Sequence, residues 1–125
     1  MDSYIVYMQT FLLAQLKIWH WQTNDHACHV ALGELYEAAG DKVDGIVELW
    51  QGRTQTRITV VDCEHKCPVD FKNPEQAIDA LQEAVELTAS KVRELEKLES
   101  YGDVVNILEE LNGILGSTMY LLTLK

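Results

Sequence analysis

Apolar residues recur at helical spacing in four separate stretches of this chain, and one long stretch without that spacing divides the four into two pairs. Residues three and four positions apart lie on one face of an α-helix, so each stretch predicts an amphipathic helix. The segment in between, residues 53–73, instead contains residues that favour an extended backbone, such as Ile58 and Val60. We expect helices over about residues 3–22, 26–51, 74–99 and 103–123.

The lengths of the connections predict how these helices are arranged. Short breaks join the first helix to the second and the third to the fourth, whereas the long segment 53–73 separates the second from the third. Two tightly joined helix pairs linked by one long crossover are typical of a ferritin-like bundle, since a simple up-down bundle has short loops throughout. The expected fold class is therefore all-α, a ferritin-like four-helix bundle, with a single domain over residues 1–125.

The charge balance narrows the classes of partner. Ten basic residues stand against twenty acidic ones, which gives a formal net charge of −10. A protein that binds DNA through its phosphates needs clustered Lys and Arg, so we do not expect DNA binding. An acidic surface suits cations instead.

Three features that the sequence lacks predict the cellular compartment: a membrane-spanning run, a secretory signal and a disulfide framework. No apolar run approaches the roughly 20 residues that span a bilayer, so no membrane partner is expected. The start Met1-Asp2-Ser3 has none of the basic residues of a secretory signal, and three cysteines are too few for a disulfide framework. We therefore expect a cytoplasmic protein with reduced thiols.

One face of the second predicted helix collects side chains of the types that bind metals. At about 100° per residue, a single stripe starts at His29 and spans roughly 100° of the helix surface. Its members are His29, Gly33, Glu37, Gly40, Asp44 and Glu48. Each glycine costs about 1 kcal/mol of helix stability relative to Ala, and close approach by another backbone would explain both glycines.

The spacing along this helix predicts two half-sites. His29 and Asp44 lie about 22 Å apart at a rise of about 1.5 Å per residue, so one chain cannot place both on one ion. Asp44 and Glu48, four residues apart, can share a site, and His20 can fold back near His29 across the turn. Antiparallel pairing of two such helices about a two-fold axis would join unlike halves into two complete sites. We expect a homodimer through the second helix, and the size of any larger assembly stays open.

The series His20-Trp21-Gln22, then His29, then Asp44 and Glu48 resembles the signature of the Dps-type mini-ferritins. That family builds its ferroxidase sites between two-fold-related subunits. The resemblance implies that His20 and His29 of one subunit and Asp44 and Glu48 of the other would bind iron. It also implies oxidation of Fe(II) by peroxide or dioxygen, which limits oxidative damage.

The sequence departs from the family at one ligand, because Gly33 stands where the family has a further carboxylate. The second hypothesis is therefore a catalytically silent helical scaffold or adaptor that keeps the dimer interface and acts through protein partners. A centre inside one bundle is not expected, since it needs Glu-x-x-His on two helices and no such motif occurs.

A second cluster of side chains that can bind a metal lies in the long segment 53–73. Cys63, His65 and Cys67 supply three ligands, but a structural zinc site requires four. The fourth would have to come from elsewhere, such as Cys28 or His26. We favour free thiols or a local disulfide over zinc at this loop.

Overall fold

The computed structural model describes residues 1–60 and 66–124, and within them the chain is helical with no β-strand. The first helical rod consists of α1 (Asp2–Tyr7), the π-helical turn η1 (Met8–Leu12) and α2 (Leu13–Gln22). Three further rods follow: α3 (His26–Thr54), α4 (Pro74–Glu96) and α5 (Gly102–Leu121). The all-α class expected from the sequence is confirmed.

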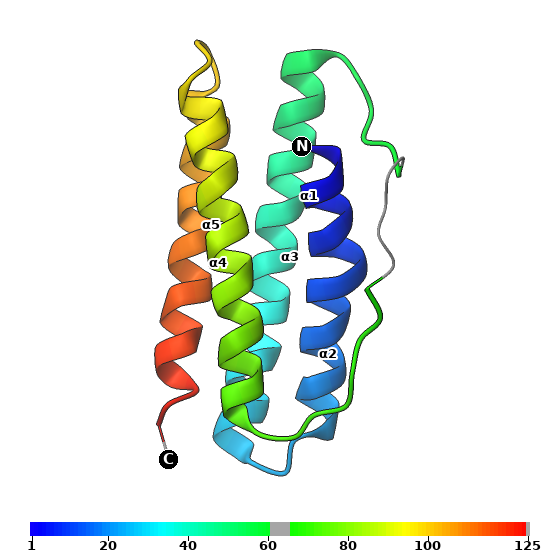
Figure 1. Cartoon of the computed structure of the whole chain (residues 1–125), viewed down its shortest axis with the longest axis vertical. Coiled ribbons are helices and arrows are strands. Elements are labelled where there is room, and N and C mark those ends of the chain that lie inside the picture. Colours follow the sequence, from blue (N-terminus) through cyan, green and yellow to red (C-terminus); the bar gives the residue numbers. More distant parts are fainter. Residues whose placement is uncertain (61–65, 125) are drawn as a thin grey trace.

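The four rods lie side by side along one long axis (Figure 1). The first rod and α3 run in opposite directions, α3 and α4 run in the same direction, and α5 returns antiparallel to α4 (Figure 1). Among the helices, α2 packs on α3, α3 packs on α5, and α5 packs on α4. The same direction of α3 and α4 requires the connection between them to return along the length of the bundle.

Each rod buries one stripe of aliphatic side chains in a common core. Leucine dominates the fully buried positions, because an unbranched Cβ and a compact side chain suit close helix packing. The largest fully buried aliphatic side chains are Met8, Leu12, Leu16, Leu32, Leu35, Ile46, Leu81, Leu108, Leu111 and Leu115. None of the helices in the described residues is both long and apolar enough to cross a membrane.

Two helix starts follow the signals in the sequence. The Asp25 carboxylate accepts a hydrogen bond of 3.0 Å from the Cys28 amide, which caps α3. The Asn73 side chain accepts one of 2.9 Å from the Gln76 amide, with Pro74 at the first position of α4. At its other end α3 runs to Thr54, three residues beyond the expected limit, and stops where Gln55 adopts a left-handed conformation with φ 56°.

The first rod contains a π-turn that helical periodicity did not predict. Over Met8–Leu12 the backbone accommodates an additional residue per turn, and the Thr10 hydroxyl donates a 2.6 Å hydrogen bond to the Val6 carbonyl. The three apolar residues of this turn, Met8, Phe11 and Leu12, are buried. Their spacing of three and four residues is also that of an ordinary α-helix, so the sequence does not reveal the π-turn.

The connection between α3 and α4 is held against the first rod by side-chain amides. The buried Gln15 amide donates to the Val69 carbonyl (2.8 Å) and accepts from the Val69 amide (2.7 Å). The Trp19 indole donates to the same carbonyl at 2.9 Å. Two turns beyond Gln15, Gln22 accepts from the Phe71 amide at 2.7 Å. An extended segment is thus paired with side chains on one helix face, in place of a second strand.

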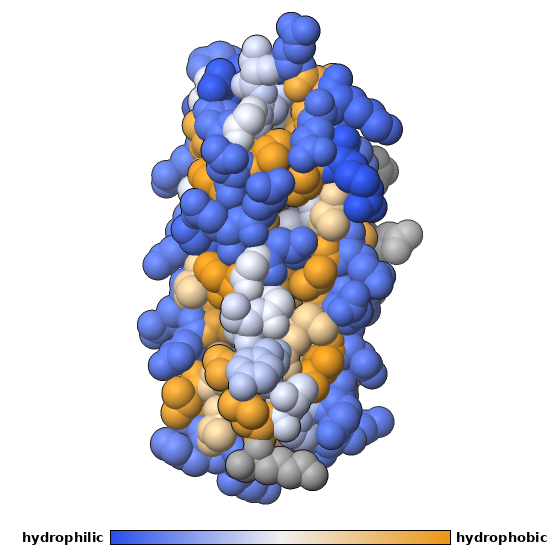
Figure 2. All heavy atoms as spheres, turned by 90° about the vertical axis from the view of Figure 1, so that its left-hand side faces the viewer, coloured by the Kyte–Doolittle hydropathy of each residue, from blue (hydrophilic) through white to orange (hydrophobic). Residues whose placement is uncertain are grey.

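The outward face of α5 has few charges in its second half. Tyr120 is 65% exposed and Leu121 is 42% exposed, and Gly113, Gly116 and Ser117 precede them on the surface. Figure 2 shows this side of the bundle, where hydrophobic and weakly polar residues form much of the lower half.

Gln15→Leu tests the hydrogen bonds to the connection. Leucine keeps the volume but leaves the Val69 amide without a partner and the Val69 carbonyl with the Trp19 indole alone, so we expect the free energy of unfolding to fall by about 1–3 kcal/mol. Urea unfolding followed by circular dichroism measures it. The exposed Gln82→Leu is the matched control, for which we expect a change within about 0.5 kcal/mol. Equal stability of the two variants would show that Gln15 does not hold the connection.

Candidate metal centre

His20 and His29 meet across the turn between α2 and α3. Their rings stack with centroids 3.8 Å apart and planes 15° from parallel. Each Nδ1 lies within hydrogen-bond distance of the other residue's backbone carbonyl, at 2.6 Å from His20 to His29 and 2.7 Å in the reverse direction. A carbonyl oxygen can only accept, so both Nδ1 atoms carry a proton and donate.

This reciprocal pair of hydrogen bonds determines what the two rings can do. In a neutral imidazole whose Nδ1 donates, Nε2 carries the free lone pair that binds metals. Metal-binding histidines commonly donate their other ring N–H to a backbone carbonyl, which fixes the orientation of the ring. Among the described residues neither Nε2 has a hydrogen-bond partner. The ring of His26 lies near His29, with centroids 6.3 Å apart.

Gly33 provides the space for His20. A Cβ added at Gly33 would lie 2.7 Å from Cε1 and 2.8 Å from Nδ1 of His20, closer than unbonded atoms approach. The ring of His20 therefore occupies the position that any side chain at residue 33 would need. The sequence suggested close approach by another backbone at this glycine, and the structure gives an imidazole of the same chain as the nearest group.

Asp44 and Glu48 lie on the exposed surface of α3, well along the helix from His29. The structure brings the two histidines together, and within one chain it does not bring the two carboxylates to them. No three potential metal ligands cluster in the parts of the chain that are described. This is the separation that a spacing of fifteen residues on one helix requires.

A shallow groove runs beside the carboxylates between the first rod and α3. It has a volume of about 410 Å³, and Tyr36, Glu37, Gly40 and Asp44 are among its lining residues. A Cβ added at Gly40 would meet no atom within 4 Å, so this glycine is open to the outside.

Trp21 follows His20 on α2 and lies near Lys17, a residue that the sequence analysis did not identify. Trp21 is 67% exposed, which is unusual for so large an apolar side chain. The Lys17 ammonium lies 5.9 Å from the centroid of the Trp21 ring and 4.7 Å from that of Tyr36. The contact with Tyr36 joins α2 to α3, whereas the contact with Trp21 lies within α2. A lysine four residues before an aromatic residue was the only signal in the sequence.

The cysteine cluster stays a prediction, because Cys63 and His65 lie outside the described residues. Cys67 is an exposed free thiol, and Cys28 is buried in the core at the start of α3. Burial raises the pKa of the Cys28 thiol and keeps it protonated. Within this chain, Cys28 therefore serves as a core residue.

A pair of glycine substitutions tests whether the His20 ring packs against Gly33. Gly40→Ala should raise the free energy of unfolding by about 0.5–1 kcal/mol, because alanine favours the helix and meets nothing. Gly33→Ala should lower it by about 1–3 kcal/mol, because the new methyl group overlaps the imidazole. Thermal unfolding at one oligomeric state compares them, and histidine NMR reports the loss of the Nδ1 hydrogen bond. Equal stabilisation by both alanines would exclude this packing.

Sequence comparison relates most of this chain to one family. A family model described as "Family of unknown function (DUF5856)" matches residues 20–122. The match begins at His20 and includes His29, Gly33, Asp44 and Glu48, and it leaves out most of the first rod. No curated protein and no solved structure gives a significant match. The chain belongs to the DUF5856 family of unknown function.

Proposed function

We propose that this protein is a Dps-related, ferritin-like protein that binds iron between two antiparallel subunits. The observation that carries the proposal is the reciprocal hydrogen bonding of His20 and His29, which leaves two oriented imidazoles with free Nε2 atoms. Side chains that only fill a turn need no such tautomer. Oriented imidazoles without a third ligand in their own chain are what a site shared by two chains requires.

The topology supports the ferritin-like assignment. Four helical rods in which the second and third run parallel, with one long connection between them, fit the ferritin-like arrangement of bundles. In such bundles the metal ligands come from the helices, as His20, His29, Asp44 and Glu48 do here.

The positions along α3 support antiparallel pairing. The midpoint between His29 and Asp44 falls between Tyr36 and Glu37, and this is also the midpoint between Gly33 and Gly40. A two-fold axis at that midpoint would place the histidines of one chain opposite the carboxylates of its partner. The groove beside Gly40 and the exposed Trp21 would both be covered in such a dimer.

The donor set suits iron as the substrate. Two imidazoles and two carboxylates per shared site match the mixed nitrogen and oxygen ligation that Fe(II) accepts in proteins. Because Gly33 contributes no carboxylate, fewer protein ligands hold the ion and more positions stay open for an oxidant. Two Fe(II) ions would each give one electron to one hydrogen peroxide, which takes up two protons and leaves as two waters. We place this activity in the cytoplasm, where thiols and Fe(II) both stay reduced.

A scaffold or adaptor is the second candidate, and a specific observation favours it. The second half of α5 exposes Tyr120 and Leu121 among glycines and serine, a surface with few charges on a chain of net charge −10. Such a surface suits a protein partner more than solvent. Under this hypothesis the histidine pair has a structural role in the turn.

Titration of the metal-free protein with Fe(II) under anaerobic conditions distinguishes the two candidates. We expect saturable binding of about one or two Fe(II) per subunit in an assembly of dimers, with oxidation on addition of peroxide. The His29→Ala/Asp44→Ala variant should lose this binding while circular dichroism shows unchanged helix content. Bound iron that is unchanged in the double variant would contradict the site, and the absence of binding by the unmodified protein would favour the adaptor.

A mixing experiment tests whether the site is shared between subunits. His29→Ala and Asp44→Ala dimers should each lose iron binding, because every site then lacks one ligand. Refolding the two variants together in equal amounts should restore about a quarter of the sites, because half of the dimers are mixed and each mixed dimer has one intact site.

Refolding of each variant alone is the control for the mixing experiment, and Glu86→Gln on α4 is the control for loss of a carboxylate elsewhere. No recovery in a mixture that contains mixed dimers, as shown by mass spectrometry, would contradict the shared site.

A further inference from the structure

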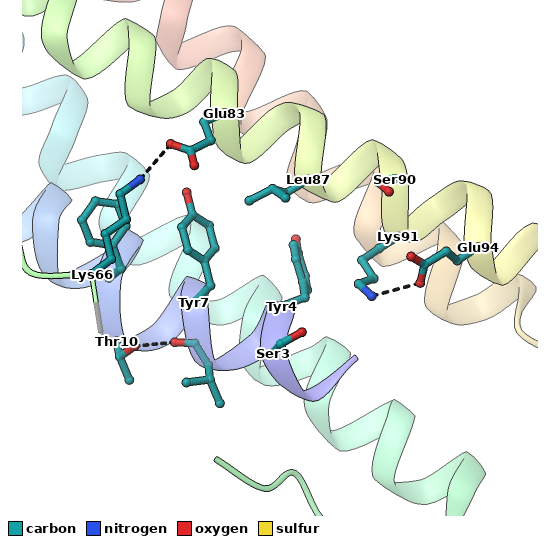
Figure 3. A pocket seen from close by; sticks show the side chains of 12 residues that line it. Ser3, Tyr4, Tyr7, Thr10, Lys66, Glu83, Leu87, Ser90, Lys91 and Glu94 are labelled. Carbon is teal, nitrogen blue, oxygen red and sulfur yellow. Dashed lines mark hydrogen bonds and ion pairs between the residues drawn. The ribbon is translucent and has the colours of Figure 1, made fainter. Parts of the chain in front are cut away.

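A cavity of about 590 Å³ opens between the first rod and α4, away from the histidines and carboxylates of α3. Figure 3 shows Tyr7 extending across it toward Glu83 and Leu87 on α4. Val6, Phe11 and Leu87 provide apolar walls. Small-molecule sites in proteins have volumes of this order and combine apolar walls with a few polar groups.

The π-turn helps to form this cavity. Thr10 and Phe11 belong to η1 and line the cavity, and the Thr10 hydroxyl is already used by the Val6 carbonyl. π-turns within α-helices are frequently found at functional sites. Its position beside the cavity is the first indication of a binding role.

The Tyr7 hydroxyl is a polar group of this cavity that lacks a partner. Its oxygen is buried and has no hydrogen-bond partner among the described residues. The neighbouring Tyr4 differs, because its hydroxyl bonds to the Thr88 hydroxyl at 2.7 Å. Burial and the negative charge of Glu83 both raise the pKa of Tyr7, so the phenol stays a hydrogen-bond donor. An unsatisfied buried donor costs free energy, which a ligand acceptor would recover.

The charges at the cavity are already paired. Lys66 forms an ion pair of 3.0 Å with Glu83, and Lys91 forms one of 2.9 Å with Glu94. Figure 3 shows these pairs at opposite ends of the cavity with the tyrosines between them. A charged ligand would have to break one of the pairs, whereas a neutral ligand would not.

We propose that this cavity binds an uncharged, mostly apolar small molecule whose carbonyl oxygen accepts a hydrogen bond from Tyr7. The apolar body would lie against Val6, Phe11 and Leu87, and the two ion pairs would border it. Ketones, esters and quinones belong to this chemical class. The site is independent of the proposed iron chemistry, since none of the four proposed iron ligands lines it.

The neutral fluorophore 6-propionyl-2-(dimethylamino)naphthalene tests this proposal, because it has an apolar body, one carbonyl and an emission that shifts with polarity. We expect saturable binding to the full chain with a blue-shifted emission. Tyr7→Phe should weaken the affinity about three- to tenfold, the effect of one hydrogen bond. Tyr120→Phe, which removes an exposed hydroxyl from α5, should leave the affinity unchanged.

A second ligand separates the hydrogen bond from the packing. The analogue with a propyl group in place of the propionyl group, measured by competition, should bind the unmodified protein and Tyr7→Phe equally. Leu87→Trp, which fills the cavity, should abolish binding of both molecules. The proposal is overturned if the unmodified protein does not bind the fluorophore, if Tyr7→Phe binds it with undiminished affinity, or if Leu87→Trp still binds it.

Discussion

The architecture depends on how one backbone unit, the amide and carbonyl of Val69, is held by the first rod. A connection that returns along a bundle leaves its own backbone groups without partners, and water or side chains must satisfy them. Here Gln15 bonds to both groups of Val69 and Trp19 shares the carbonyl, while Gln22 accepts from the amide of Phe71, two residues further along. Because the connection is fixed in this position, α4 starts at the same end of the bundle as α3 and runs parallel to it. That direction determines that α2 and α3 share one open surface and that the first rod and α4 enclose the cavity.

The helices could be predicted from the sequence, but the contacts that hold the connection between α3 and α4 could not. Apolar spacing located the four rods, and the side chains of Asp25 and Asn73 cap the starts of two of them in the structure. Gln15 carried no signal, since a glutamine within an amphipathic helix normally faces water, and only the folded chain shows it fully buried. The π-turn was equally hidden, because its buried residues Met8, Phe11 and Leu12 have the three- and four-residue spacing of an ordinary α-helix.

The site was predictable in part. The proximity of His20 and His29 followed from the turn between them, and the separation of His29 from Asp44 followed from helix geometry. The stacking of the rings and the exchange of hydrogen bonds could not be predicted, because both depend on side-chain angles that the turn selects. For the same reason Gly33 was read as a missing ligand and a point of close approach, while its nearest neighbour in the structure is the imidazole of His20. Gly40 is different, because nothing in its own chain comes near it.

The exchange of hydrogen bonds between His20 and His29 has a consequence for the order in which the chain folds. It joins residues nine positions apart, whereas the bonds from Gln15 to Val69 join residues fifty-four positions apart. Closing a short loop costs less entropy than closing a long one, so contacts between near neighbours form sooner. We therefore expect the α2–α3 hairpin, closed by its two imidazoles, to be the nucleus on which the later rods assemble. The connection, which contacts Gln15 across fifty-four residues, would dock on this hairpin before α4 and α5, whose contacts Tyr4–Thr88 and Lys42–Glu110 span eighty-four and sixty-eight residues.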